Sequence, residues 1–418
     1  MAAGWYATAL LLPRLRRCVS TMPCQLLRCD PASITFNASG EPNFTADATR
    51  DALSIASHHL VALKRPVVFP TETVYGLGAL ALDGTAASLI FSTKGRPADN
   101  PLIVHVSSMS MLRSILPPDY TLSKTYEALI KHFWPGPLTM LFPRHADIIP
   151  NIITAGQSTI AVRMPSHPVA RALIAVANAP LAAPSANSSG KPSPTRAEHV
   201  HRDLGDKVDI ILDGGPCGVG LESTVVDGLG ADGHLRVLRP GGVTVEDLQR
   251  TLHQELHASG DMPRVLVHRR DYRDDAMELA PTTPGMKYKH YSPSVPVVLV
   301  HTLTSPPEGM QLQTAASLVS SLRDRFPDRP VHIGLMTPDD SRLAQLLHGH
   351  EGVSWRLFPL GKVTQPAVIA QRLFDGFLTL DREGVDVILI EGVAEVDEGL
   401  AIMNRVRKAA GEAAWVSL

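Results

Sequence analysis

Short apolar runs alternate with helical patterns on both sides of a single break, and this alternation restricts the fold more than any other feature of the chain. Short runs of apolar residues indicate buried strands, whereas apolar residues at helical spacing indicate amphipathic helices. The break, residues 261–293, is charged, contains several prolines and lacks such periodicity, which is typical of a linker. We therefore predict two α/β domains, the second with a small, mostly parallel sheet and helices outside it.

Each domain contains its own series of predicted elements. In the first, strands are expected at 67–69, 102–106, 138–142, 159–164, 208–212 and 235–238, and helices at 46–65, 85–93, 122–133, 167–178 and from 245 onward. In the second, strands are expected at 295–300, 331–336 and 385–390, and helices at 312–326, 341–348 and 365–380. The second domain contains no Gly-x-Gly-x-x-Gly fingerprint, so we expect it to dock or regulate rather than to catalyse.

The length and composition fit a leader, a first domain, a linker and a second domain. At 418 residues, with 44% hydrophobic and 19% charged residues, the chain is long enough to bury two cores. The expected boundaries are 1–45 for the leader, 46–260 for the first, catalytic domain, 261–293 for the linker and 294–418 for the second domain. A formal net charge of −2 argues against attraction of nucleic acid by a global positive field.

The leader carries several arginines and no acidic residue before Asp30. Its apolar segment precedes its basic residues, so it resembles a mitochondrial transit peptide more than a secretory signal; a disordered extension is the alternative. Met22 offers a second start that would omit most of the basic segment. We expect a cytoplasmic protein, with a mitochondrial form if the leader acts as a transit peptide.

Cysteine usage and hydropathy limit the class of protein further. The four cysteines, at positions 18, 24, 29 and 217, contain no Cys-x-x-Cys pair and form no plausible disulfide framework, so a reduced interior without a metal site is expected. No apolar run reaches the roughly 18 residues that a membrane-spanning helix needs, so we expect no membrane contact.

Residues 94–106 form a stiff polar corner in the first domain. Gly95 permits close approach of the backbone to a ligand, and Pro97 and Pro101 restrict the loop before the apolar run 102–106. Lys94 and Arg96 are expected to project from this corner, where arginine grips a phosphate in bidentate fashion and lysine acts as a point charge. A solvated basic turn is the alternative. The presence of other polar loops elsewhere in the chain favours the phosphate site.

Those other loops place hydroxyls, amides and cations beside apolar runs. Residues 185–195 combine Ser, Asn, Gly and Lys in a potential anion-binding loop, but they lack the first glycine of a Walker loop. Arg163 interrupts an apolar run, and because an unpaired buried cation is costly we expect it to face a cleft or an anion. A salt-bridged strand arginine is the alternative. Together these loops are typical of a nucleotide pocket.

The linker contains an unusual aromatic and basic run. Residues 281–293 read Pro-Thr-Thr-Pro-Gly-Met-Lys-Tyr-Lys-His-Tyr-Ser-Pro. Tyrosines, lysines and a histidine are able to stack on and pair with a nucleotide, so residues 288–291 are expected to act as a lid over the site.

The order of the motifs resembles that of the YrdC-like superfamily. The motifs are Pro-Thr-Glu-Thr-Val-Tyr-Gly-Leu-Gly at 70–78, Lys-Gly-Arg-Pro at 94–97 with Asn-Pro-Leu at 100–102, Trp-Pro-Gly-Pro-Leu-Thr at 134–139 and Ser-Ala-Asn at 185–187. The linker run at 284–291 and Met-Asn-Arg-Val-Arg-Lys-Ala-Ala at 403–410 resemble the longer, two-domain threonylcarbamoyl-AMP synthases. The resemblance covers about residue 46 to the C-terminus. It implies a YrdC-like twisted open α/β sheet with a concave basic face, and a smaller, Rossmann-like α/β C-terminal domain.

The resemblance also implies which residues bind substrates. Threonine would be bound by Thr73, His105, Arg163, Ala183 and Ser223. ATP would be held by Arg96, Asn100, Thr159, Ser185, Asn187, Ser193, Arg239 and Tyr291. Lys94 and Arg96 would be the catalytic cations, and no residue is expected to ligate a metal ion.

In that family L-threonine, bicarbonate or CO2, and ATP are joined into threonylcarbamoyl-AMP with release of pyrophosphate. A separate transferase then modifies the tRNA adenosine beside the anticodon. Fixed cations suit this chemistry, because negative charge builds up on the phosphate and no nucleophilic side chain is needed. Mg²⁺ is expected to be carried by ATP rather than by a cage of protein carboxylates.

Two other functions compete with this one. Carbamoyltransferases of hydrogenase maturation share a YrdC-like domain, but their zinc-binding Cys-x-x-Cys pairs and further catalytic domains do not occur in this sequence. An RNA-binding module on the concave basic face is the other; the acidic balance of the chain weakens it and leaves at most a weak RNA contact. A synthase releases pyrophosphate only with threonine and bicarbonate, whereas an RNA-binding module shows salt-dependent affinity without turnover.

Overall fold

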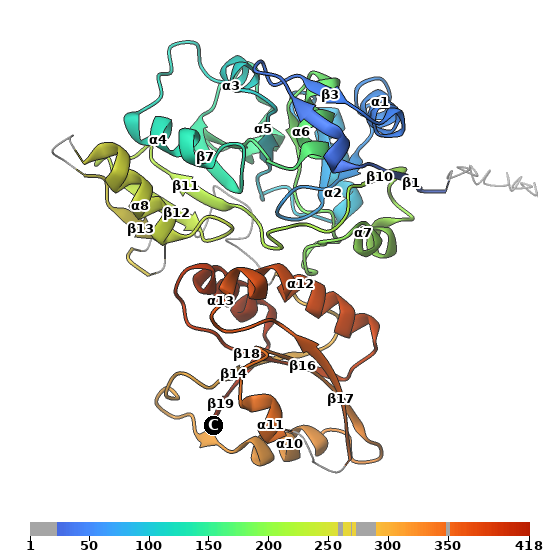
Figure 1. Cartoon of the computed structure of the whole chain (residues 1–418), viewed down its shortest axis with the longest axis vertical. Coiled ribbons are helices and arrows are strands. Elements are labelled where there is room, and N and C mark those ends of the chain that lie inside the picture. Colours follow the sequence, from blue (N-terminus) through green and yellow to red (C-terminus); the bar gives the residue numbers. More distant parts are fainter. Residues whose placement is uncertain (1–22, 258–261, 269, 273–289, 348–351) are drawn as a thin grey trace, which may run out of the picture.

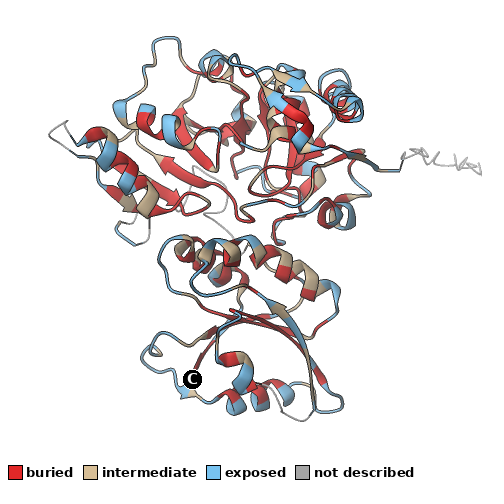
Figure 2. Ribbon diagram, in the orientation of Figure 1, coloured by how far each residue is buried: buried red, intermediate tan, exposed pale blue. Residues whose placement is uncertain are grey.

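The computed structural model describes residues 23–257, 262–268, 270–272, 290–347 and 352–418. Within them the chain forms two α/β units, which lie one above the other in Figure 1. Buried residues concentrate on the strands of both sheets and on the helix faces that cover them (Figure 2). The predicted α/β class is confirmed.

The larger unit is built on a mixed sheet that has eleven strands among the described residues, in the order β1, β10, β4, β5, β9, β6, β8, β7, β11, β12, β13. Their bounds are β1 Gln25–Arg28, β4 Val67–Phe69, β5 Gly76–Leu80, β6 Ile103–His105, β7 Leu138–Pro143, β8 Thr159–Arg163, β9 Leu181–Ala182, β10 Ile210–Asp213, β11 Thr224–Asp227, β12 Leu235–Arg239 and β13 Val265–Val267. Because neighbours in the sheet are distant in the sequence, loops from separate motifs meet at its centre.

Helices cover most of this sheet. On one face lie α1 (Asp47–Val61) and α6 (Pro168–Ala177), which pack on each other. The other face is covered by α2 (Gly84–Lys94), α3 (Met109–Ile115), α4 (Lys124–Phe133), α5 (Asn151–Thr154), α7 (Ala197–Leu204) and α8 (Val245–Leu256). On the face opposite these six helices the central strands are less covered. A small apolar cluster on that face contains Ile103 and Ala161.

The segment before residue 46 is part of the fold, so the expectation of a leader extending to residue 45 is wrong. β1 pairs in parallel with β10 at the end of the sheet, and β2 (Ile34–Phe36) pairs with β3 (Pro42–Phe44) after a short 3-10 turn, η1 (Pro31–Ser33). Cys29 and Ile34 are buried in the core between α1 and α6. Residues 1–22 lie outside the described residues.

The smaller unit has an all-parallel sheet among its described residues, in the order β15, β19, β14, β18, β16, β17. Its strands are β14 Val297–His301, β15 Leu312–Gln313, β16 Val331–Thr337, β17 Val353–Pro359, β18 Val387–Glu391 and β19 Glu412–Val416. One face packs on α10 (Ala315–Arg323) and α11 (Leu343–Leu347). The other packs on α12 (Pro366–Arg382) and α13 (Glu398–Ala409), which face the larger unit (Figure 1).

The apolar pattern missed several elements at the ends of the domains. β17 is half exposed, so its residues lack a continuous apolar run, and α13 and β19 were also not predicted. The helix predicted at 312–326 begins only at Ala315, because the Thr314 hydroxyl accepts a hydrogen bond from the Ser317 amide at 3.1 Å and caps it. β13 pairs with β12, so the first domain extends past the expected boundary at residue 260.

The two units pack directly on each other. Leu221 of the larger unit belongs to one apolar cluster with Leu373 of α12. Gly220 lies so close to the backbone of Gln371 that a side chain at this position would clash with α12. No helix in the described part of the chain is both long and apolar enough to cross a membrane.

Candidate active site

Three neighbouring strands present one row of polar side chains. Side chains alternate between the faces of a strand, and the apolar positions between the polar ones are buried beneath the helices. On the opposite face, the register pairs His105 of β6 with Arg163 of β8, and Arg163 with Thr139 of β7. The strand pairing therefore brings together residues from three separate motifs.

This row borders a cavity of about 60 Å³. The cavity is lined by Thr73, Val74, Arg96, Ile103, His105, Arg163, Ala183, Pro184, Ser185, Glu222, Ser223, Arg239, His290 and Tyr291. All five residues predicted to bind threonine are in this wall, as are Arg96, Ser185, Arg239 and Tyr291 from the set predicted for ATP. The geometry thus assembles the two predicted sites as one.

Arg163 is anchored from three sides. Its Nη1 donates to Thr73 Oγ1 at 2.9 Å and its Nε donates to the carbonyl of Gly136 at 3.2 Å. Its Nη2 forms an ion pair with Glu72 Oε1 at 2.7 Å. Both interpretations of Arg163 therefore hold, because the guanidinium faces the cleft and is also salt-bridged.

His105 is a neutral group in the cavity wall. Burial and the charge of Arg163 lower the pKa of His105 to about 3. Its Nδ1 atom has no hydrogen-bond partner among the described residues. An uncharged imidazole with an unused nitrogen is suited to exchange a hydrogen bond with a substrate hydroxyl.

Arg239 ends β12 and lies beside Ser223. Its Nη2 donates to the Ser223 carbonyl at 2.8 Å and to Ser223 Oγ at 3.2 Å, while Ser223 Oγ lies 2.7 Å from Thr139 Oγ1. Burial lowers the pKa of Arg239. A fully enclosed guanidinium beside two hydroxyls forms the cationic end of the cavity.

The two cations of the 94–101 corner point in different directions. Gly95 ends α2 at a φ of 63°, which favours glycine. Arg96 lines the cavity, with Nε donating to the Asn100 carbonyl at 3.2 Å and Nη2 to the Pro101 carbonyl at 2.9 Å. Burial and the neighbouring Arg239 lower the pKa of Arg96 to about 10.

Lys94 does not project into the cavity, so that expectation is wrong. Its Nζ donates to the carbonyls of Ser185 and Asn187 and is buried beneath their loop. Burial and the charge of Arg96 lower the pKa of Lys94. The physical reason is that a buried ammonium needs acceptors, and the carbonyls of the 185–195 loop supply them. Lys94 thus fixes the shape of this loop from behind.

Four further residues predicted for ATP lie outside the cavity wall. The carbonyl of Asn100 accepts from Arg96, and Ser193 Oγ donates to Glu222 Oε1 at 2.6 Å. The Asn187 amide donates to carbonyls of its own loop. Thr159 begins β8, and its Oγ1 has no hydrogen-bond partner among the described residues. Asn100, Asn187 and Ser193 therefore shape the loops around the cavity rather than its surface.

The end of the linker lies against the cavity. Tyr291 is buried, and its ring centroid is 5.3 Å from that of Phe374 on α12. Burial and the Glu222 carboxylate raise the pKa of Tyr291 to about 12, whereas burial and the charge of Arg96 lower the pKa of His290 to about 4. Of the predicted lid, residues 288 and 289 lie outside the described residues.

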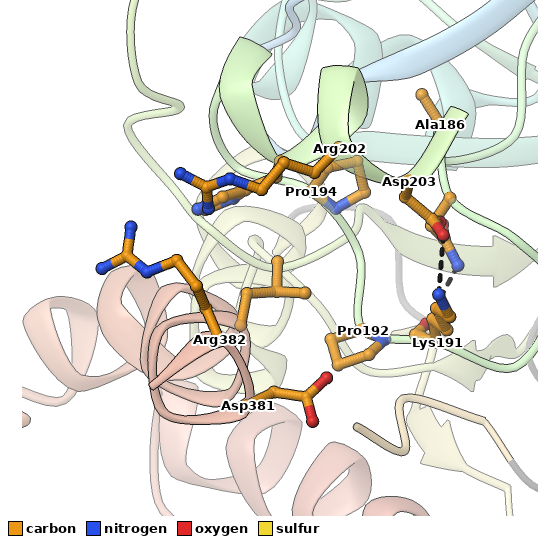
Figure 3. Close-up of a pocket in the computed structure, with 11 residues that line it drawn as sticks. Ala186, Lys191, Pro192, Pro194, Arg202, Asp203, Asp381 and Arg382 are labelled. Carbon is orange, nitrogen blue, oxygen red and sulfur yellow. Dashed lines mark hydrogen bonds and ion pairs between the residues drawn. The ribbon is translucent and has the colours of Figure 1, made fainter. Parts of the chain in front are cut away.

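A second pocket, of about 230 Å³, lies between α7 and α12. Figure 3 shows the guanidiniums of Arg202 and Arg382 on one side of it and the Lys191–Asp203 ion pair on the other. Asn187 belongs to this pocket rather than to the cavity. The back of the 185–195 loop therefore faces the junction between the two units.

Two acidic residues of the site were not assigned from the sequence: Glu72 and Glu222. The cost of burying the Arg163 guanidinium could have indicated an acidic partner such as Glu72, because a carboxylate offsets a buried positive charge. Glu222 follows a glycine-rich segment without periodicity, so nothing in the local pattern marked it.

The fold and the cavity define a two-domain α/β protein with a buried cluster of cationic side chains in its site. A family model described as "Telomere recombination" matches residues 62–241, and one described as "Threonylcarbamoyl-AMP synthase, C-terminal domain" matches residues 243–411. The threonylcarbamoyl-AMP synthase of Schizosaccharomyces pombe is 42% identical over 396 residues, covering 87% of this chain and 89% of that protein. The one from Pyrococcus abyssi is 40% identical over 345 residues, covering 82% and 90%.

A solved structure, P. abyssi Sua5 complexed with L-threonine, has a TM-score of 0.69 at 38% identity and covers 88% of this chain and 96% of that one. The chain belongs to the threonylcarbamoyl-AMP synthase family, whose members are enzymes that transfer a nucleotidyl group from ATP to make an adenylate. The resemblance seen in the motifs is confirmed over both domains.

Proposed function

We propose that this chain joins L-threonine, bicarbonate or CO2, and ATP into threonylcarbamoyl-AMP and pyrophosphate, for the threonylcarbamoyladenosine modification of tRNA beside the anticodon. The observation that supports this most is the convergence of three buried guanidiniums, those of Arg96, Arg163 and Arg239, on one cavity. Such a cavity binds anionic groups and stabilises charge that develops on them.

Threonine is proposed to occupy the part of the cavity around the polar row. Arg163 is positioned to hold the carboxylate, and the Thr73 and Ser223 hydroxyls are positioned to bind its polar atoms. Neutral His105, which lines the cavity, is proposed to form a hydrogen bond with the threonine hydroxyl. The methyl group that separates threonine from serine is worth only about 1–3 kcal/mol. Hydrogen bonds to the hydroxyl add to that discrimination against amino acids without one.

The reaction needs no side-chain nucleophile. The threonine amine displaces hydroxide from bicarbonate to form the carbamate, and the displaced hydroxide leaves as water with an amine proton. A carbamate oxygen then attacks the α-phosphorus of ATP, and the bond to the bridging oxygen breaks as pyrophosphate leaves. Arg96 and Arg239 are proposed to neutralise the charge of the phosphates, while Lys94 keeps the 185–195 loop in place.

Mg²⁺ is proposed to enter with the triphosphate. The described carboxylate of the cavity wall, Glu222, is occupied by Ser193 and by Arg405 of α13, and hard cations are well served by phosphate oxygens and water. When bound, the ion neutralises part of the charge on the leaving pyrophosphate.

The end of the linker is proposed to open and close the site. His290 and Tyr291 line the cavity at this end of the linker, and we propose that they shift as ATP enters. The Ser292 amide donates to the Gly190 carbonyl at 2.9 Å, which ties this segment to the 185–195 loop. Closure protects the carbamate, which loses CO2 in water.

The product is proposed to pass to a separate transferase that acts on tRNA, with at most a weak contact of this chain to the RNA. We also propose a cytoplasmic location, with residues 1–22 as the segment that would direct a mitochondrial form.

The deciding experiment measures pyrophosphate release from ATP with purified chain and Mg²⁺. Release that requires both threonine and bicarbonate, together with an adenylate that contains labelled threonine, is the expected result. Release without threonine, or no adenylate with all substrates present, contradicts the proposal.

A further inference from the structure

The smaller domain inserts one arginine into the wall behind the active site. Arg405 is in α13, yet its side chain is completely buried at the junction with the larger domain. Its Nε donates to Glu222 Oε2 at 3.1 Å, and its Nη1 donates to the carbonyl of Pro240. The ion pair joins residues that are 183 positions apart. Arg405 therefore contacts both the residue before Ser223 and the residue after Arg239.

Glu222 is the carboxylate that Arg405 holds. It lines the cavity, and its other oxygen accepts from Ser193 Oγ at 2.6 Å. Burial alone would raise the pKa of Glu222, but Arg405 and then Arg239 outweigh burial and lower it, so the group is charged. The cavity wall thus contains a buried negative charge that is stabilised by two arginines, Arg405 and Arg239.

The consequence concerns Arg239, which the proposed function assigns to the phosphates of ATP. When a buried carboxylate loses its counter-ion, pairing with another nearby cation becomes favourable, because an uncompensated charge in the interior is very costly. Arg239 lines the same cavity as Glu222, and its Nη2 donates to the carbonyl of the next residue, Ser223, at 2.8 Å. Pairing of these two side chains would cancel a positive charge at the end of the cavity.

We propose that Arg405 is a positioning residue for the reaction: the smaller domain uses it to hold the Glu222 carboxylate, which keeps Glu222 from pairing with Arg239. The guanidinium carbon of Arg405 also lies 5.8 Å from the ring centroid of Tyr291, so the same side chain supports the linker end. The inference rests on the proposed function, and it gives the smaller domain an indirect part in binding ATP.

The position of Arg405 is well determined by its surroundings. The neighbouring residues Ile402, Met403 and Val406 are buried in the core of the smaller domain, so α13 cannot turn without disrupting that core. The backbone of Gly241 is so close to that of Glu222 and Ser223 that a side chain there would clash. Arg405 is therefore inserted between segments that have little room to move.

The test compares steady-state pyrophosphate release in Arg405→Met, Glu222→Gln and the double variant, with ATP and threonine varied separately. Methionine keeps most of the length and the apolar contacts of arginine. We expect Arg405→Met to raise KM for ATP by at least about tenfold, equivalent to about 1.4 kcal/mol, with KM for threonine changed much less. Adding Glu222→Gln removes the stray negative charge and should restore most of the affinity for ATP.

Two matched controls separate this effect from loss of an ordinary ion pair. Arg407→Met removes an exposed pair with Glu395 from the same helix, and Arg196→Met removes an exposed pair with Asp375 across the same junction. Neither should change KM for ATP appreciably, since exposed ion pairs contribute little free energy.

The outcomes are distinct. If Arg405→Met raises both KM values equally, or if Glu222→Gln fails to rescue it, Arg405 has a structural role alone and the inference is overturned. If Arg405→Met does not fold, Arg405→Lys keeps the charge but cannot reach Glu222 and Pro240 together; an unchanged KM for ATP in that variant overturns the inference as well. Failure of the wild-type chain to release pyrophosphate with threonine would instead contradict the proposed function.

Discussion

Replacement of Arg163 by lysine tests the geometry of the threonine site most directly. Arginine contacts Thr73, Gly136 and Glu72 at once through three nitrogens, whereas a lysine ammonium at this depth keeps the Glu72 pair alone. Two charge-assisted hydrogen bonds are lost, each worth about 1.5–3 kcal/mol, so about 3–6 kcal/mol is removed in total.

This loss should be divided between folding and binding. If about 2 kcal/mol falls on threonine binding, KM for threonine rises about thirtyfold. The rest should appear as a lower midpoint of urea unfolding. Arg163→Met should be worse, because it leaves Glu72 buried without a counter-ion, at a cost of about 3–5 kcal/mol in the free energy of unfolding.

The assay is pyrophosphate release with threonine varied at saturating ATP and bicarbonate, combined with urea unfolding of each variant. Arg171→Lys is the matched control, since Arg171 donates to the Ser107 carbonyl at 3.1 Å but lies outside the cavity. An Arg163→Lys variant with wild-type KM for threonine and unchanged unfolding would refute the role assigned to this side chain.

Three further predictions follow from burial and pairing. His105 has a pKa of about 3 in the folded chain and about 6.5 in the unfolded chain, so protons bind the unfolded chain first as the pH falls below about 6.5 and the free energy of unfolding decreases. Urea unfolding of the wild type should show a loss of about 2 kcal/mol between about pH 6.5 and 5. The His105→Gln variant should not show this loss. Removal of residues 1–45 should lower the thermal midpoint sharply, because β1 and the buried Cys29 and Ile34 are lost; an unchanged midpoint would contradict this packing. Tyr291→Phe keeps the ring contact with Phe374, which is worth about 0.5–1.5 kcal/mol, whereas Tyr291→Ala removes it. Tyr291→Phe should therefore lower kcat/KM for ATP less than Tyr291→Ala does. Equal effects of the two substitutions would refute the packing role.

Much of the fold was predictable from local patterns. The strands at 67–69, 138–143 and 159–163 and the helices at 84–94 and 366–382 match continuous apolar runs or helical periodicity, which depend only on nearby residues. β17 and the segment around β1 were missed because edge strands have weak apolar patterns, and their pairing partners are distant in the sequence.

The sequence by itself determined the α/β class and the order of the motifs, because these follow from periodicity and from residue types at fixed spacing, and the resemblance of those motifs to a known family implied nine of the fourteen residues that line the cavity. Only the tertiary structure decided where each charge points. It turned Lys94 toward the loop carbonyls, paired Arg163 with Glu72, and brought Arg405 of one domain to Glu222 of the other. The physical reason is that a buried charge must find its partner wherever the packed chain places one, and no local pattern encodes a contact made by the docking of two domains.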